Sequence, residues 1–331
     1  LPSLGEDSVT LRAIGAVASD VLPDVRATRI DDALAANVKG SLRMVTLIKR
    51  LVNLPLSDGP TQLLTTVKGN VLKLDASALD RIRTSVAAHG KLNASRDAAE
   101  RAVLAALRPQ VPEELGLDAD AIDLITSSSA YRTFLSTWWP PLVPTEVLRR
   151  LADAGVVDRI ATDLLTEAER AALTASYATH DDWSVADTAL LDELAAILGP
   201  LPRDAGDSDP TLFLTSGAEV SELVTMADRY TRSIEADPDD DSVENYAHLL
   251  IDESQDVTPM QWRMLRRRGP QASWTIVGDL AQSSWPDLDE VGRAVRELIG
   301  SAPHREFRLS VNYRSPKEVF DLAAEIVKRA Y

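Results

Sequence analysis

A short aliphatic run that ends abruptly in carboxylates constrains this chain more than any other feature. Residues 248–251 are His-Leu-Leu-Ile, and Asp252 and Glu253 follow directly. Such a run is typical of a buried strand, and α/β proteins place their chemistry at the carboxyl ends of parallel strands. Adjacent residues that leave a strand point in different directions, so one carboxylate can face a hydrated magnesium ion while the other faces an attacking water. Taken alone, the run is more simply explained as an ordinary strand end.

Two further segments repeat this pattern downstream. Residues 274–277 are Trp-Thr-Ile-Val and lead to Gln282, and residues 307–311 are Phe-Arg-Leu-Ser-Val and lead to Tyr313 and Arg314. We expect three short strands of one sheet, each followed by polar or aromatic side chains. An ordinary surface ion pair would explain Arg314 in isolation, but the three segments in order favour a shared site.

The ordered trio resembles motifs II, III and IV of the UvrD/Rep group of superfamily 1 helicases and translocases. The resemblance implies that Asp252 binds magnesium and that Glu253 polarises the water that attacks the γ-phosphate of ATP. It also implies that Gln282 senses the γ-phosphate, that Tyr313 stacks on the adenine, and that Arg314 is the arginine finger. These residue types suit phosphoryl transfer, which needs positioning and charge neutralisation. The chain is thus expected to belong to an ATPase that uses ATP and Mg²⁺.

The sequence contains no G-x-x-x-x-G-K-[ST] loop, which cradles phosphates in such ATPases. In the UvrD/Rep group this loop lies upstream of motif II. We therefore expect a fragment that begins after the loop and that alone hydrolyses ATP at no meaningful rate. The predicted fold class is α/β: an incomplete RecA-like P-loop motor domain with a parallel sheet, interrupted by a large, mostly α-helical insertion.

The predicted domain boundaries follow from where helical periodicity replaces strand patterns. Residues 1–22 would be part of the first RecA-like domain, with a strand near 9–11 and a helix to about 22. Residues 23–199 would form the helical insertion, and residues 200–245 an acidic irregular loop. Residues 246–308 would form the rest of the first RecA-like domain, and residues 309–331 motif IV and the start of a second motor domain. Within the insertion we expect one helix over 31–53, a strand-like piece at 62–74, two helices in 76–107 broken near residue 90, and helices over 118–139 and 145–177. A helix is also expected over 317–330.

Composition narrows the possible partners. The chain has 331 residues, 51 acidic against 35 basic side chains and a net charge of −16, so any contact with nucleic acid must be local. It has no cysteine, which rules out disulfides and thiolate metal sites and fits a reducing cytoplasm. No apolar run approaches the length of a membrane span, so we expect a cytoplasmic protein without a membrane partner.

Two aromatic clusters lie in the insertion. Trp138 and Trp139 precede a proline-rich stretch that suggests an exposed, stiff elbow, and they could form a platform for bases or a partner, or fill gaps between helices. For Trp183, gap filling is the simpler interpretation. Residues 1–6, 91–96 and 183–193 resemble segments of the HelD-like ATPases that associate with bacterial RNA polymerase. This resemblance implies that core RNA polymerase is the partner and that much of residues 23–199 forms an arm that enters one of its channels.

An acidic run precedes the motif II strand. It contains Asp237, Asp239, Asp240 and Asp241, and a plain solvated linker is its default interpretation. The family resemblance adds a sharper hypothesis, in which these carboxylates bind within the main channel of the polymerase and compete with nucleic acid or approach its catalytic magnesium.

Three functions remain open. The leading one is a HelD-like motor that binds RNA polymerase and remodels, dissociates or recycles it with ATP, with nucleic acid as a second partner left open. The alternative is a DNA helicase or translocase of the UvrD/Rep type, and the third is an interaction module with vestigial motifs. After Trp285 the chain has Pro-Asp-Leu-Asp-Glu in place of the group's DNA-holding Trp-Arg-Gly, and those carboxylates would repel phosphates. The retained Asp252, Glu253, Gln282 and Arg314 argue against a vestigial site.

Overall fold

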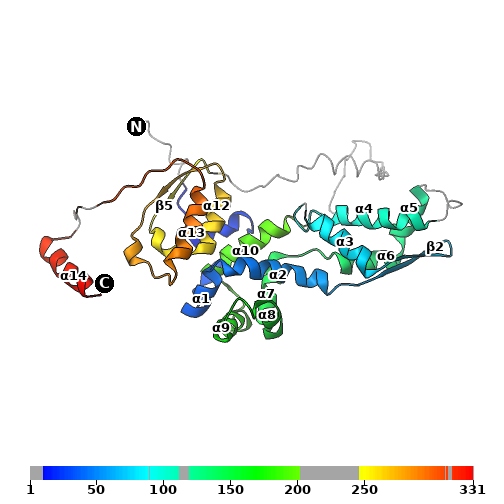
Figure 1. Ribbon diagram of the computed structural model, residues 1–331, viewed down its shortest axis with the longest axis horizontal. Helices are drawn as coiled ribbons and strands as arrows, with labels where there is room; N and C mark the ends of the chain where they lie inside the picture. The colour runs from blue at the N-terminus through cyan, green and yellow to red at the C-terminus, as the bar shows by residue number, and fades with distance from the viewer. Residues whose placement is uncertain are drawn as a thin grey trace, which may run out of the picture.

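The fold is mixed α/β and mostly helical (Figure 1). The computed structural model describes residues 10–88, 90–111, 119–201, 246–309, 311 and 315–330. These residues contain three sheets of two strands each: β1 and β4 are parallel, β2 and β3 antiparallel, and β5 and β6 parallel. The molecule is elongated, with the β2–β3 hairpin near one end of the helical body and β5, α12 and α13 at the other end of that body.

The chain first builds the helical body. Its elements are η2 (Ile14–Asp20), β1 (Ala27–Arg29), α1 (Ala33–Gly40), α2 (Arg43–Ser57), β2 (Leu63–Val67), β3 (Asn70–Leu74), α3 (Ala76–Ala87), α4 (Arg96–Leu107), η3 (Arg108–Gln110), α5 (Ala119–Ser127), α6 (Ser129–Trp138), α7 (Pro144–Arg149), η5 (Arg150–Ala152), α8 (Ala154–Ala161), α9 (Glu167–Ala178), β4 (Trp183–Ser184) and α10 (Val185–Leu198).

The C-terminal described part carries the two parallel strands. Its elements are β5 (His248–Ile251), η6 (Ser254–Asp256), α12 (Pro259–Arg268), β6 (Ser273–Ile276), η7 (Leu280–Gln282), α13 (Leu288–Ile299) and α14 (Lys317–Ala330). In Figure 1, α14 lies apart from the rest, beyond an extended segment. None of the described helices combines the length and apolar character needed to span a bilayer.

Several helices begin where the sequence supplies a capping box. At the start of α9, Thr166 Oγ1 accepts from the amide of Glu169, whose carboxylate accepts from the Thr166 amide. Ser184 with Asp187 does the same for α10. These reciprocal bonds satisfy amides that a helix start leaves without partners. They fix the positions at which the chain turns into the helices that surround the core.

Helix α10 lies in the centre of the main hydrophobic core. Residues 187–194 of this helix are all buried, including Leu190, Leu191 and Leu194 at 0% exposure. A helix that is buried around its whole circumference needs packing partners on every side. The core it joins includes residues from α2, the β2–β3 hairpin, α4, α6, α7, α8 and α9.

Helix α12 belongs to two cores. Met260 and Met264 are fully buried in the main core. Trp262 and Leu265 belong to a smaller core with Val291 of α13, against which one face of the β5–β6 pair packs. Because α12 is the next α-helix after β5 and η6, it connects the end of this strand to the helical body.

The structure has helices in all of the stretches where the insertion is expected to be helical, but it divides the stretches 31–53, 118–139 and 145–177 into shorter helices. The predicted piece at 62–74 is the β2–β3 hairpin, the break near residue 90 separates α3 from α4, and the helix over 317–330 is α14. The single helix expected over 31–53 is instead two helices, α1 and α2, which meet at Ser41 and Leu42. Glu290 causes this break, because its carboxylate accepts from Ser41 Oγ (2.9 Å) and from the Leu42 amide (2.7 Å).

Three predictions about strands were wrong within the described residues. Thr10 and Leu11 form no strand, and the expected N-terminal helix is the 3₁₀-helix η2. Residues 302–309 have no regular structure, so the expected third strand is not present there. The β5 strand is covered on one face only: Leu250 is 64% exposed, whereas Ile251 packs on the smaller core. A strand needs a neighbour to complete its hydrogen bonds and a layer to cover each face, and the pattern of apolar residues specifies neither.

Candidate functional site

The carboxyl ends of β5 and β6 bring two loops side by side. The strands pair in parallel over their whole length, so the chain leaves both at the same edge. The pairing continues beyond them, since the Val277 amide donates to Ile251 O (2.8 Å) and the Ser254 amide donates to Val277 O (3.0 Å). Loop 252–256 and loop 278–283 are therefore neighbours, as the sequence predicted.

Asp252 and Glu253 are both exposed at this edge. Glu253 has a left-handed backbone, with φ 49° and ψ 45°, which an L-residue with a long side chain rarely adopts. Asp252 Oδ1 accepts from the Glu253 amide (2.9 Å) and supports this turn. The two neighbouring carboxylates have different partners, since that of Asp252 accepts from the Glu253 amide and that of Glu253 accepts from Gln255. Strain of this kind, of order 1–3 kcal/mol per residue, persists where the surroundings fix it and is frequent at functional sites.

Gln255 joins the two loops, a role that the sequence motifs do not predict. Its Nε2 donates to Glu253 Oε2 (2.6 Å), and its Oε1 accepts from the Asp279 amide (3.0 Å). Its carbonyl accepts from Ser283 Oγ (3.1 Å), and the residue is only 5% exposed. An amide can donate and accept at once, so it can hold a carboxylate and a backbone amide together. The sequence feature that could have identified Gln255 is its position two residues after Glu253, the second carboxylate of the motif.

Gly278 allows this close approach of the two loops. A Cβ at this position would collide with Ser254 Oγ and would lie 2.8 Å from Gln255 Oε1. It would also lie 3.0 Å from the Ser254 amide nitrogen, which cannot move without shifting the backbone. Glycine is therefore required here by space, since backbone of one loop meets backbone of the other.

Gln282 lies in the second loop and is exposed. Its Nε2 donates to Asp279 Oδ2 (3.0 Å), and Asp279 Oδ1 accepts from the Ala281 amide (3.0 Å). The bond from Gln282 and then that from Ala281 lower the pKa of Asp279 below its usual value. The structure thus holds Gln282 within its own loop, beside the loop of Asp252 and Glu253.

The segment after the second loop attaches to the helical body. Trp285 Nε1 donates to Glu290 Oε2 (3.2 Å), and the other carboxylate oxygen of Glu290 caps the start of α2. The Trp285 ring lies against Gly40, where an added Cβ would come within 2.7 Å of the ring. Glu290 is 7% exposed, so this carboxylate faces the protein interior and is not one that repels a bound phosphate.

A second link joins the site to the body through α12. Arg263 and Arg267 both bind Glu193 of α10, with N–O distances of 2.9 and 2.7 Å. Arg267 and Arg268 both bind Asp192, the latter at 2.5 Å. The two carboxylates are 4% exposed or less, and the charges are paired as buried charges must be.

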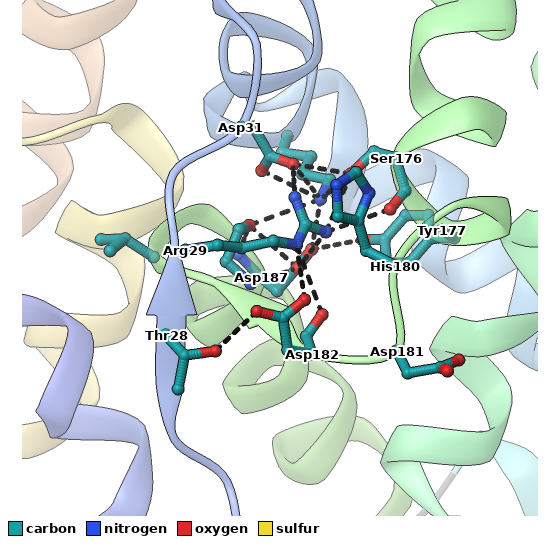
Figure 2. Close-up of polar contacts among 12 residues, drawn as sticks. Thr28, Arg29, Asp31, Ser176, Tyr177, His180, Asp181, Asp182 and Asp187 are labelled. Carbon is teal, nitrogen blue, oxygen red and sulfur yellow. Dashed lines mark hydrogen bonds and ion pairs between the residues drawn. The ribbon is translucent and has the colours of Figure 1, made fainter.

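A third polar cluster includes Arg29, Asp31, Ser176, Tyr177 and Asp187 (Figure 2). Lys39 of α1 is fully buried and binds Asp187 (2.7 Å) and Asp31 (3.0 Å). Burial opposes ionisation of Asp31, but hydrogen bonds from serines and the charge of Lys39 outweigh it and lower its pKa to about 2. Burial, and then the neighbouring Asp187, raise the pKa of Tyr177 well above its usual value. The cluster fastens α1, α9 and α10 together.

The tryptophans expected on an exposed elbow are buried. Trp138 and Trp139 are 0% and 1% exposed, and Trp139 Nε1 donates to Leu92 O (2.9 Å). Phe134 stacks on Trp138 with ring centroids 5.5 Å apart. Of the prolines that follow, Pro144 is buried and Pro141 is exposed. Because both tryptophan rings are buried, neither offers a surface to a partner. Trp183 packs partly buried against the core, as gap filling predicts.

Six of the predicted site residues lie outside the described residues. They are Asp237, Asp239, Asp240, Asp241, Tyr313 and Arg314. The expected roles of these side chains therefore stay predictions. Of the expected site residues, the structure brings together Asp252, Glu253 and Gln282.

The residues present fit a magnesium ion of the kind that nucleotides carry. The described residues contain no group of three or more His, Cys, Asp or Glu that could hold a metal by themselves. Mg²⁺ in nucleotide sites is held by one or two carboxylates, with phosphate oxygens and waters as the remaining ligands. The exposed Asp252 carboxylate at the strand end suits such a role.

No protein-family model matches this chain, and no curated protein sequence matches it.

Proposed function

We propose that this chain belongs to an ATP-dependent motor that binds bacterial RNA polymerase and remodels, dissociates or recycles it, as HelD-like proteins do. The observation that supports the motor chemistry is the joining of loop 252–256 to loop 278–283 through Gln255 at the carboxyl edge of two parallel strands. Open α/β sheets bind their ligands at this edge. The RecA-like character of the domain is part of the proposal.

The proposed roles follow from the side chains at that edge. Asp252 would hold Mg²⁺, and Glu253 would polarise the attacking water, because their backbones diverge at the left-handed Glu253. Gln282 would respond to the γ-phosphate by exchanging its bond to Asp279 for a bond to the nucleotide. Bound Mg·ATP supplies the phosphoryl group that is transferred to water. Tyr313 and Arg314 would contact the adenine and the transferring phosphate.

The links to the helical body supply a route for coupling. Glu290, after the second loop, binds the junction of α1 and α2. Helix α12, after the first loop, binds α10 through Asp192 and Glu193. Each link extends from one of the two loops, so a change in either loop would bias the position of the body. The body is the proposed polymerase-binding arm.

The alternative, a DNA helicase or translocase of the UvrD/Rep type, is less well supported. In that group, the aromatic residue that corresponds to Trp285 is followed by a DNA-holding sequence. Here Trp285 lies against Gly40 and donates to Glu290. Asp287 and Asp289, which follow it, are exposed carboxylates that would repel a phosphate backbone. Strand unwinding therefore has less support than polymerase remodelling.

Retention of core RNA polymerase by the immobilised chain tests the proposal. The binding is measured at about 0.15 M salt, where exposed charges are largely screened beyond about 8 Å. An unrelated protein of similar size and net charge serves as the control. We expect the chain to retain polymerase and the control to retain none. Retention by neither protein, together with tight binding of single-stranded DNA, would support the helicase alternative.

The acidic run is tested in the same assay. Changing Asp239, Asp240 and Asp241 together to Asn should weaken polymerase retention and should reduce displacement of nucleic acid from the polymerase. Unchanged retention and unchanged displacement would show that the run is only a linker.

A further inference from the structure

Three arginines at the C-terminal end of α12 line a pocket of about 360 Å³. The pocket is formed by Arg263, Arg266, Arg267 and Pro270. Residues three and four apart on a helix are neighbours, so the three guanidiniums project from one face. A concentration of positive charge of this kind is unexpected in a chain with a net charge of −16.

The local charges do not cancel. The guanidiniums of Arg263, Arg267 and Arg268 bind the two buried carboxylates of Asp192 and Glu193. Glu297 is about half exposed and approaches Arg263 only at 3.9 Å. Arg266 is exposed and has no ion-pair partner in the part of the chain that the structure describes. Favourable interaction with the negative end of the helix dipole explains cations at this position, but it does not explain a pocket between them.

The pocket is at the opposite end of α12 from loop 252–256. The carbonyl of Arg268 accepts from the amide of Tyr246, which precedes β5. The pocket therefore lies near the beginning of the β5 strand, whereas Asp252 and Glu253 lie at its end. It is a separate site from the proposed nucleotide edge and does not depend on the proposed function.

We propose that this pocket binds phosphate groups of a nucleic-acid backbone. Guanidinium forks bind phosphate with two parallel hydrogen bonds and remain charged at any physiological pH. Arginine is favoured over lysine in phosphate and nucleic-acid recognition, because its planar fork matches the geometry of a phosphate group. A nucleic-acid backbone presents one such group at every nucleotide. Neighbouring arginines on a helix have Cβ atoms about 5–6 Å apart, so each can bind a different phosphate of the backbone.

The test measures fluorescence anisotropy of a labelled single-stranded oligothymidylate titrated with the intact chain. Arg266→Glu is the informative variant, because Arg263 and Arg267 also hold buried carboxylates and their loss would disturb the fold. Arg132→Glu on α6 is the matched control: this exposed helical arginine undergoes the same change of charge far from the pocket. Binding is compared at about 50 and 200 mM salt, a range over which phosphate contacts lose much of their affinity.

We expect Arg266→Glu to weaken binding roughly ten-fold and to reduce the salt slope by about 0.7 to 1, the value of one lost phosphate contact. Arg132→Glu should leave both quantities nearly unchanged. Equal effects of the two variants, or no binding by the unmodified chain at about 50 mM salt, would overturn the proposal. A polyglutamate peptide of equal charge is added as a competitor. If polyglutamate displaces the labelled oligonucleotide at the same concentration as unlabelled oligothymidylate, the pocket binds any polyanion. The assignment to nucleic acid then fails.

Discussion

Replacing Lys39 with Met should destabilise the helical body strongly. The Lys39 ammonium is fully buried, lies 2.7 Å from Asp187 and 3.0 Å from Asp31, and donates to Ser176 Oγ (2.8 Å). Without it, Asp187 keeps only hydrogen bonds and a guanidinium of Arg29 at 3.8 Å. Breaking a buried pair by removing one partner typically costs about 3–5 kcal/mol. Because Arg29 also binds Asp31, we expect about 3 kcal/mol, a large part of the 5–15 kcal/mol typical of a folded protein.

Urea denaturation monitored by tryptophan fluorescence and circular dichroism measures this change. With a slope of about 3 kcal/mol per molar urea, the midpoint should fall by about 1 M. Arg159→Met is the matched control: Arg159 pairs with Asp58 at the surface, where both side chains are about half exposed, and its loss should leave the midpoint almost unchanged. Adding Asp187→Asn to Lys39→Met should recover part of the loss. A midpoint for Lys39→Met as close to wild type as that of Arg159→Met would show that the buried Lys39 ion pairs do not stabilise the helical body.

Three further outcomes are expected. Gly40→Ala should destabilise the protein by about 1–3 kcal/mol in thermal or urea unfolding, because the new Cβ would lie 2.7 Å from the Trp285 ring. Gly292→Ala, in a helix where the nearest neighbour is the flexible end of an arginine, should instead be neutral or stabilising by up to about 1 kcal/mol; equal losses for both glycines would contradict this account. Gln255→Ala should accelerate hydrogen exchange of the amides in loop 278–283 by roughly 10–100-fold, and unchanged exchange would show that the two loops do not depend on it. The pKa of Asp31 is lowered from 3.8 to about 2, so its ionised form should contribute about 1–2 kcal/mol, reduced for solvent screening, to the free energy of unfolding. This contribution should be present above pH 4 and lost as the pH falls through 2. In Asp31→Asn, the free energy of unfolding should therefore depend less on pH in this range.

The local sequence pattern predicted those helices and strands that depend on neighbouring residues. The strands β5 and β6 and their order relative to the carboxylates follow from two short apolar runs, and most helices follow from spacing of apolar residues. The capping boxes at Thr166, Ser184 and Thr258 are also readable, because both partners lie within four residues. These features needed no knowledge of distant contacts.

Features set by distant residues were not predictable. The break between α1 and α2 is produced by Glu290, which lies 248 positions beyond Leu42 in the sequence. The burial of Trp139 depends on a carbonyl at Leu92, 47 positions away. The pairing of arginines on α12 with carboxylates on α10 likewise joins segments about 75 positions apart. In each case the deciding partner comes from another element, and periodicity carries no information about which elements meet.

The candidate site shows the same division. Motif residues identified Asp252, Glu253 and Gln282, and the parallel pairing brings their loops together. The residue that connects those loops, Gln255, was visible in the sequence but had no assigned role. Its importance depends on the amide of Asp279, 24 positions away, and on the space left by Gly278.

Paramagnetic broadening of amide NMR signals by Mn²⁺ and ATP tests the central claim most directly. Mn²⁺ takes the same oxygen ligands as Mg²⁺ and broadens the signals of nuclei close to it. The account predicts that millimolar Mn·ATP broadens amides of loops 252–256 and 278–283 in the intact chain and that Asp252→Asn removes this effect. Broadening elsewhere, or at these loops but unchanged in Asp252→Asn, would contradict the claim that the edge of β5 and β6 is the nucleotide site.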